Sequence, residues 1–181
     1  LSERLPEVVG SVIVPTLEGT RPLLVEVQAL TNVTSFSLPR RTANGIDLNR
    51  LLLVTAVLNK RLGLALSNND VIVNVVGGLK VSEPAADLAM GLAIASSIKN
   101  IPIASDTVVI GEVGLSGEIR GVNDTNRRLY AAAELGFQRS IIPLSSANQS
   151  SKIKGLQTIS VSLLSEAVET IMPAAKPKRH K

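Results

Sequence analysis

The segment from Glu83 to Lys99 constrains the fold of this chain more than any other. It opens with Glu83-Pro84, and proline is tolerated at an early helix position. Small side chains then recur through the segment: Ala85, Ala86, Ala89, Gly91, Ala93 and Ala95. Because such side chains let a helix backbone approach its neighbour closely, the segment predicts a helix packed tightly against a sheet.

The sequence around this helix alternates between strand-like and helix-like patterns. A further helix is predicted from an N-cap at Asp47 to a glycine end at Gly63. A third is predicted over 124–136, with Asp124 as its N-cap, and a fourth over 163–171. Strands are predicted at 8–14, which ends at Pro15, and at 23–30, 70–76, 107–110, 139–142 and 158–161; residues 31–45 are predicted as a loop and 111–122 as strand-loop-strand. This order predicts one mixed α/β (α+β) domain with helices packed on a mixed sheet.

The composition excludes several kinds of site. Phe36, Tyr130 and Phe137 are the only aromatic residues, too few for the stacking platforms that bind single-stranded nucleic acid. The chain has no cysteine, so disulfides, cysteine-based zinc sites and thiol catalysis are excluded within it. The only histidine is His180, near the C-terminus, which disfavours a histidine-based triad.

The formal net charge of +4 has a local origin. Four basic residues lie in the last six positions, and without them the chain carries 15 basic and 15 acidic residues: they are Lys176, Lys178, Arg179 and Lys181. We therefore expect a folded domain over 1–172 and a disordered basic tail over 173–181. A nucleic-acid site in the folded part must then be a local cluster of basic side chains. With no signal peptide and no long apolar stretch, we expect a cytoplasmic protein without a membrane partner.

The glycine-rich segment 111–121 does not match a nucleotide-binding motif. It lacks both the G-x-x-x-x-G-K-[ST] and the G-x-G-x-x-G order. Gly114 and Gly117 are better explained by a tight turn with positive φ. We therefore expect no cofactor, nucleotide or metal site in these 181 residues.

Six stretches, in this order, resemble the C-terminal domain of the bacterial RadA/Sms DNA-repair family. They begin with Glu18-Gly-Thr-Arg-Pro-Leu-Leu-Val-Glu-Val-Gln-Ala-Leu30 and Asn44-Gly-Ile-Asp-Leu-Asn-Arg50, followed by Lys60-Arg-Leu-Gly63, Gly77-Gly-Leu-Lys-Val-Ser-Glu-Pro-Ala-Ala-Asp-Leu-Ala89, Gly111-Glu-Val-Gly-Leu-Ser-Gly-Glu-Ile-Arg120 and Ala132-Ala-Glu-Leu-Gly-Phe137. Together with their flanks they extend over roughly residues 8 to 172. No single stretch is decisive, but their order is specific.

The same region is similar, more distantly, to the proteolytic domain of Lon, a ribosomal protein S5 domain 2-like fold. The position of the Lon serine nucleophile is Ala85 here, and a methyl group cannot attack a carbonyl. The position of the general-base lysine falls on Arg128, and arginine is not deprotonated at working pH. The resemblance therefore implies a domain that has lost its peptidase dyad.

The RadA/Sms resemblance implies a ring-forming, ATP-driven motor for branch migration that acts with the RecA recombinase. ATP with Mg²⁺, and Zn²⁺, would be bound by domains preceding Leu1. The ring is expected to be a hexamer. This domain is expected to form a non-catalytic platform of that ring and to contact duplex or branched DNA. Two alternatives remain open: a Lon-type serine peptidase with a shifted dyad, for which Ser82 lies near the lost site, or a peptide-binding remnant of one.

The candidate DNA-binding residues are basic side chains next to predicted turns. Lys80 and Arg120 are the main candidates, supported by Arg40, Arg41 or Arg50. Phosphate contact needs such charges and carries no sequence information. For any one of these residues, a solvated surface position or a pairing with a carboxylate is the competing interpretation. A second alternative places all DNA binding in the basic tail.

Overall fold

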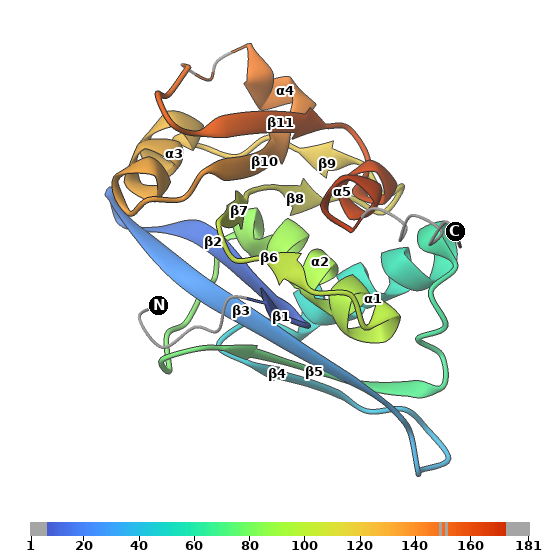
Figure 1. Ribbon diagram of the computed structural model, residues 1–181. Coiled ribbons are helices and arrows are strands. Elements are labelled where there is room, and N and C mark those ends of the chain that lie inside the picture. Colours follow the sequence, from blue (N-terminus) through green and yellow to red (C-terminus); the bar gives the residue numbers. More distant parts are fainter. Residues whose placement is uncertain (1–6, 149, 151, 173–181) are drawn as a thin grey trace, which may run out of the picture.

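The computed structural model describes residues 7–148, 150 and 152–172. A seven-stranded sheet in the order β11-β10-β7-β2-β3-β5-β4 forms its centre (Figure 1). β2 and β3, and β3 and β5, pair antiparallel, whereas the other neighbours pair parallel. The strands are β2 (Ser11–Glu18), β3 (Arg21–Val33), β4 (Arg41–Asn44), β5 (Asn69–Val75), β7 (Thr107–Val109), β10 (Arg139–Pro143) and β11 (Gln157–Val161). The predicted mixed α/β architecture is confirmed.

Five α-helices and two small ribbons complete the described part of the chain. The helices are α1 (Leu48–Leu62), α2 (Asp87–Lys99), α3 (Thr125–Glu134), α4 (Leu144–Ala147) and α5 (Leu164–Ile171). The ribbons pair β1 (Glu7–Val8) with β6 (Ile103–Ala104), and β8 (Glu112–Val113) with β9 (Ile119–Arg120). As predicted, the Asp47 side chain caps α1 by accepting the backbone N–H of Arg50, and Gly63 ends α1 in a left-handed conformation. The predicted tail, residues 173–181, lies outside the described residues.

Helix α2 fills the centre of the core. It packs against β2 and β3, and also against α1 and α5. Every residue from Asp87 to Ser96 on it is buried. A Cβ atom added at Gly91 would lie 3.4 Å from a methyl carbon of Leu164 and of Val54, so a glycine lets three helices meet there. The prediction of close packing by small residues is therefore confirmed.

Ala89 tests this packing, because it is fully buried on α2. The variant Ala89→Leu adds three carbons where α2 meets its neighbours. We expect the free energy of unfolding to fall by ~1–3 kcal/mol, the usual effect of overpacking a filled core. Urea denaturation measures this, with Lys60→Leu on the exposed side of α1 as the control. Unchanged stability of Ala89→Leu would contradict the packing described here.

The predicted end of the first strand at Pro15 is wrong. β2 continues through Pro15 to Glu18, and the turn to β3 lies at residues 19–20. Proline lacks a backbone N–H, but the backbone nitrogen and carbonyl of Pro15 lie on the edge of β2 that points away from β3. There its carbonyl accepts a hydrogen bond from the Nη1 atom of Arg128, at 2.9 Å. The β2–β3 ladder therefore loses no hydrogen bond at this residue.

Four further local predictions are corrected. The predicted loop 31–45 contains the end of β3 and all of β4, which forms through pairing with β5 although only Ala43 in it is apolar. Asp124 precedes α3 in a left-handed conformation, and its side chain makes no capping hydrogen bond. The helix predicted from Pro84 opens as a 3₁₀ turn, Pro84–Ala86, before α2 begins. The predicted strand 8–14 is interrupted by a turn at residues 9–10, which separates β1 from β2. The short elements β6 and α4 were not predicted.

Candidate functional site

Ala85, at the position that the resemblance to Lon assigns to the serine nucleophile, is part of the core. It lies in the 3₁₀ turn before α2, and 1% of its surface is exposed. Its methyl group belongs to a cluster with four other buried side chains, Ile110, Leu129, Ile142 and Leu156. A group in this position therefore faces apolar side chains.

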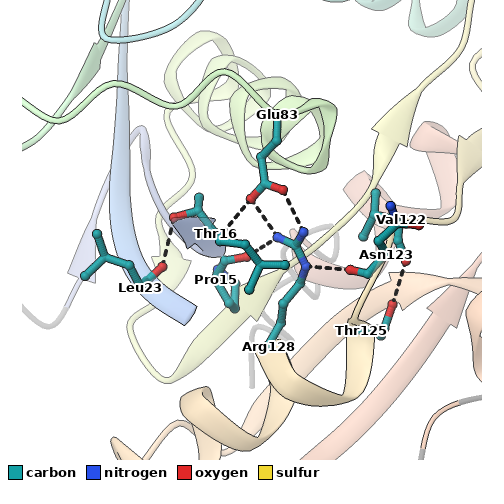
Figure 2. A network of polar contacts seen from close by, with 9 residues as sticks. Pro15, Thr16, Leu23, Glu83, Val122, Asn123, Thr125 and Arg128 are labelled. Atoms are coloured by element: carbon teal, nitrogen blue, oxygen red, sulfur yellow. Dashed lines mark hydrogen bonds and ion pairs between the residues drawn. The ribbon is translucent and has the colours of Figure 1, made fainter. Parts of the chain in front are cut away.

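Arg128, at the position that the resemblance to Lon assigns to the general base, lies in a closed polar network on α3 (Figure 2). Only 2% of its side chain is exposed. Its Nη1 and Nη2 atoms donate to the two carboxylate oxygens of Glu83 at 2.7 and 2.6 Å, and its Nε donates to the Asn123 carbonyl at 2.9 Å. Nη1 also donates to the Pro15 carbonyl. Bidentate pairs of this kind are among the strongest polar contacts in proteins.

The Arg128–Glu83 pair also completes the outer edge of β2. β2 pairs with β7 only at Ile13, so the residues after Ile13 have no neighbouring strand on that side. The pair takes the place of a strand, because Arg128 donates to the Pro15 carbonyl and Glu83 accepts the Leu17 N–H at 2.9 Å. Arg128 therefore joins α3, the turn before α2 and the sheet, which is a structural role.

A second ion pair joins α1 to α2. The Arg50 guanidinium donates to both carboxylate oxygens of Asp87, whose side chain is 3% exposed. Asp87 also accepts the Val113 N–H at 3.1 Å. The hydrogen bond to Asp87 raises the pKa of Arg50, whereas burial raises the pKa of the Asp87 carboxyl against the opposing effect of Arg50. Arg50 is thus held by a buried carboxylate and is not a freely solvated cation.

Lys80 lies on the ridge between two neighbouring clefts. The first cleft, of about 420 Å³, runs between the end of β2 and the 79–83 segment. The second, of similar volume, lies between that segment and the start of α1, where Arg50 forms part of the wall. Lys80 is exposed, and no carboxylate of the described residues lies within 4.0 Å of its amine, the limit for an ion pair. Two of the predicted residues, Lys80 and Arg50, thus border the same cleft.

Arg120 reaches the same region from the β8–β9 ribbon. It is the cross-strand partner of Glu112, so their side chains lie on one face of the ribbon. Glu112 in turn lies 3.9 Å from Arg50, measured from Oε1 to Nη2. Arg120 is exposed, and it makes no ion pair within the described part of the chain. Arg50 and Arg120 therefore flank one carboxylate.

Arg40 and Arg41 lie at the other end of β4. Arg41 is the first residue of β4, and Gly45, on the wall of the second cleft, follows its last residue. At the usual rise per residue, about 13 Å of extended chain separates Arg41 from Gly45. The Arg41 guanidinium donates to the carbonyls of Leu66 and Asn69, and burial lowers its pKa. Arg40 lies 3.7 Å from Asp70, between Nη2 and Oδ2. The structure does not bring these two arginines to Lys80.

The two buried ion pairs are the polar features that sequence reasoning missed. A signal for Arg128 was present: Thr125, Arg128, Leu129 and Ala132 follow the i, i+3, i+4, i+7 spacing of a buried helix face, and all four are buried. Ser82, which the sequence analysis considered for a shifted dyad, is exposed on the ridge between the clefts. No group of three or more histidine or acidic side chains in the described ranges is placed to hold a metal ion. Likewise, none of the described helices has the length and apolarity needed to cross a bilayer.

Comparison with known proteins places these features in a family. The chain is 49% identical over 170 residues to DNA repair protein RadA of Bacillus subtilis, covering 94% of this chain and 37% of that protein. It is 46% identical to the proteins of the same name from Streptococcus pneumoniae and Escherichia coli, covering 94% and 88% of this chain and 41% and 34% of theirs. The chain thus spans less than half the length of these relatives.

A family model described as subunit ChlI of Mg-chelatase matches residues 25–148, which is more than half of the chain. The matched region runs from β3 to the end of α4 and contains α2, Arg128 and both clefts apart from residues 16–23. The chain belongs to this ChlI family.

Proposed function

We propose that this chain is a non-catalytic, DNA-binding and ring-forming domain of a RadA-type DNA-repair protein. The similarity to DNA repair protein RadA carries the proposal, because it extends over 88–96% of this chain at 44–49% identity. The chain spans only part of those proteins, so we also propose that it belongs to a longer protein with the activity of a whole RadA-type protein. That activity is branch migration driven by ATP with Mg²⁺, with Zn²⁺ bound elsewhere and RecA as a partner.

The proposed domain is Lon-like but is not a peptidase. Support comes from the two positions that the Lon resemblance assigns to its dyad. Ala85 is buried among apolar side chains, and the Arg128 guanidinium is occupied by Glu83 and backbone carbonyls. A serine peptidase with a shifted dyad would need a base within hydrogen-bond reach of Ser82. No observation favours that function or a peptide-binding remnant over the non-catalytic domain.

The proposed DNA surface consists of Lys80 and Arg120, with Arg50 between them. The exposed cations Lys80 and Arg120 are available to phosphates, while Arg50 is held in place by Asp87. Because backbone contact requires no aromatic platform, this surface suits duplex DNA. In a ring, repetition of the surface would strengthen the local field although the folded part has balanced charge.

The proposed surface is tested by titrating duplex DNA at several salt concentrations. We expect Lys80→Ala and Arg120→Ala each to weaken binding equally for all sequences and to lower the slope of log affinity against log salt by about one. Lys99→Ala and Arg40→Ala serve as matched controls, since both side chains are exposed and lie away from the clefts. The surface is refuted if the controls and the two variants have the same slope.

A further inference from the structure

Glu112 places a carboxylate in the middle of the proposed DNA surface. Its Oε1 atom lies 3.9 Å from Nη2 of Arg50, and its side chain is 33% exposed. Arg120 faces it across the β8–β9 ribbon, where the Cβ atoms of cross-strand partners are about 5 Å apart. A carboxylate so close to two cations attracts both of them, so it competes with any phosphate that approaches either one.

The backbone on both sides of Glu112 is fixed to the region where α2 begins. On one side the Gly111 N–H donates to the Ala85 carbonyl at 3.1 Å. On the other side the Val113 N–H donates to the Asp87 carboxylate, also at 3.1 Å. The fold therefore determines the point from which the Glu112 carboxylate reaches the surface, and a bound DNA phosphate would have to share the cations with it.

The charges around Arg50 are unequally matched. Nε and Nη2 of Arg50 donate to the buried Asp87 carboxylate, which balances its charge, while Nη1 makes no hydrogen bond within the described part of the chain. Because Asp87 already balances Arg50, the negative charge of Glu112 offsets that of Arg120. Lys80, on the wall of the same cleft as Arg50, is then the cation in excess.

We propose that Glu112 is a built-in competitor of DNA: its carboxylate attracts Arg50 and Arg120 in the free protein and weakens the hold of both on a backbone phosphate. This inference rests on the proposed DNA-binding function and assigns a regulating side chain to the same surface. The DNA contact is weaker than three cations alone would make it and is released more readily. Such a contact suits a protein that is proposed to move along DNA.

Titration of duplex DNA with the 181-residue chain, in the presence of a chelator of divalent cations, tests this proposal. Glu112→Gln removes the charge and keeps the size of the side chain, so affinity should rise about two- to fivefold, the equivalent of one exposed ion pair. The gain should be largest at low salt, because salt screens these charges. Glu112→Lys should bind more tightly still. Glu134→Gln is the matched control, since it makes the same charge change on an exposed side chain at the end of α3, away from both clefts.

A double-mutant cycle shows whether Glu112 acts through its basic neighbours. In a chain that carries Arg120→Ala, the gain from Glu112→Gln should be smaller than in the wild-type chain, because one of the two competing cations is absent. An equal gain in both chains, or an equal gain from Glu134→Gln, would mean that net charge alone matters and would overturn the proposal.

The same titration separates failure of this inference from failure of the proposed function. If Glu112→Gln binds as wild type or more weakly, with an unchanged circular dichroism spectrum, the inference is wrong; weaker binding by Lys80→Ala would show that the DNA surface itself survives. If Lys80→Ala and Arg120→Ala also bind as wild type, the surface and its competitor are both refuted. Glu112→Ala removes the same carboxylate and should show the same gain, so the result does not depend on one variant folding.

Discussion

Replacing Arg128 with methionine should lower the free energy of unfolding by about 3–5 kcal/mol, the range for breaking a buried ion pair by removing one partner. The variant leaves the Glu83 carboxylate without its cation, and the carbonyls of Pro15 and Asn123 without a donor. The outer edge of β2 also loses its contact with α3. Urea denaturation monitored by circular dichroism measures the change.

Two further variants separate the effect of the unpaired Glu83 charge from the other effects of losing Arg128. Combining Arg128→Met with Glu83→Gln removes both charges, so it should be less destabilising than Arg128→Met alone. Arg139→Met breaks the partly exposed pair with Asp106 and should cost at most about 1 kcal/mol. If Arg128→Met is no more destabilising than Arg139→Met, the structural role assigned to Arg128 is wrong.

Replacing Arg50 with methionine should destabilise the protein in a way that depends on pH. The variant leaves the buried Asp87 carboxylate with only the Val113 N–H, at a cost of about 3 kcal/mol at neutral pH. Burial raises the pKa of Asp87, and the loss of Arg50 raises it further. A raised carboxyl pKa means that the folded state binds the proton more tightly, so stability falls as pH rises through that pKa.

The difference between wild type and Arg50→Met should therefore be largest at neutral pH and shrink towards acid pH, where Asp87 is protonated. Denaturation series at several pH values measure this difference. Asp47→Ala is a useful control, because it removes an exposed cap on the same helix without leaving a buried charge. If the free energy of unfolding of Arg50→Met falls short of the wild-type value by the same amount across this pH range, an unpaired buried carboxylate is not the cause.

The fold was predictable where local pattern and packing agree. α1 has an aspartate cap, apolar residues at helical spacing and a glycine end, and α2 has small residues along its whole length. β4 was missed because its pairing with β5, and not its own sequence, makes it a strand. Pro15 was misread because the effect of a proline depends on which side of the strand its missing N–H faces.

The site was predictable only in part, because sequence spacing does not show which charges meet. The loss of a peptidase dyad at Ala85 and Arg128 is implied by the resemblance to Lon and stays a prediction. The partner of Arg128 is 45 residues away and that of Arg50 is 37 residues away, so their pairing depends on the tertiary fold. The same limit explains why Arg40 and Arg41, adjacent to each other in sequence, lie apart from Lys80 and Arg120 in space.

Titration of duplex DNA with a chain that lacks residues 174–181 tests the proposed function most directly. This deletion removes all four tail cations and leaves the clefts and the β8–β9 ribbon intact. Binding through the Lys80 and Arg120 surface should persist, with affinity that falls steeply as salt increases. The contrary result is a complete loss of binding on deletion, with Lys80→Ala and Arg120→Ala in the full chain binding as wild type.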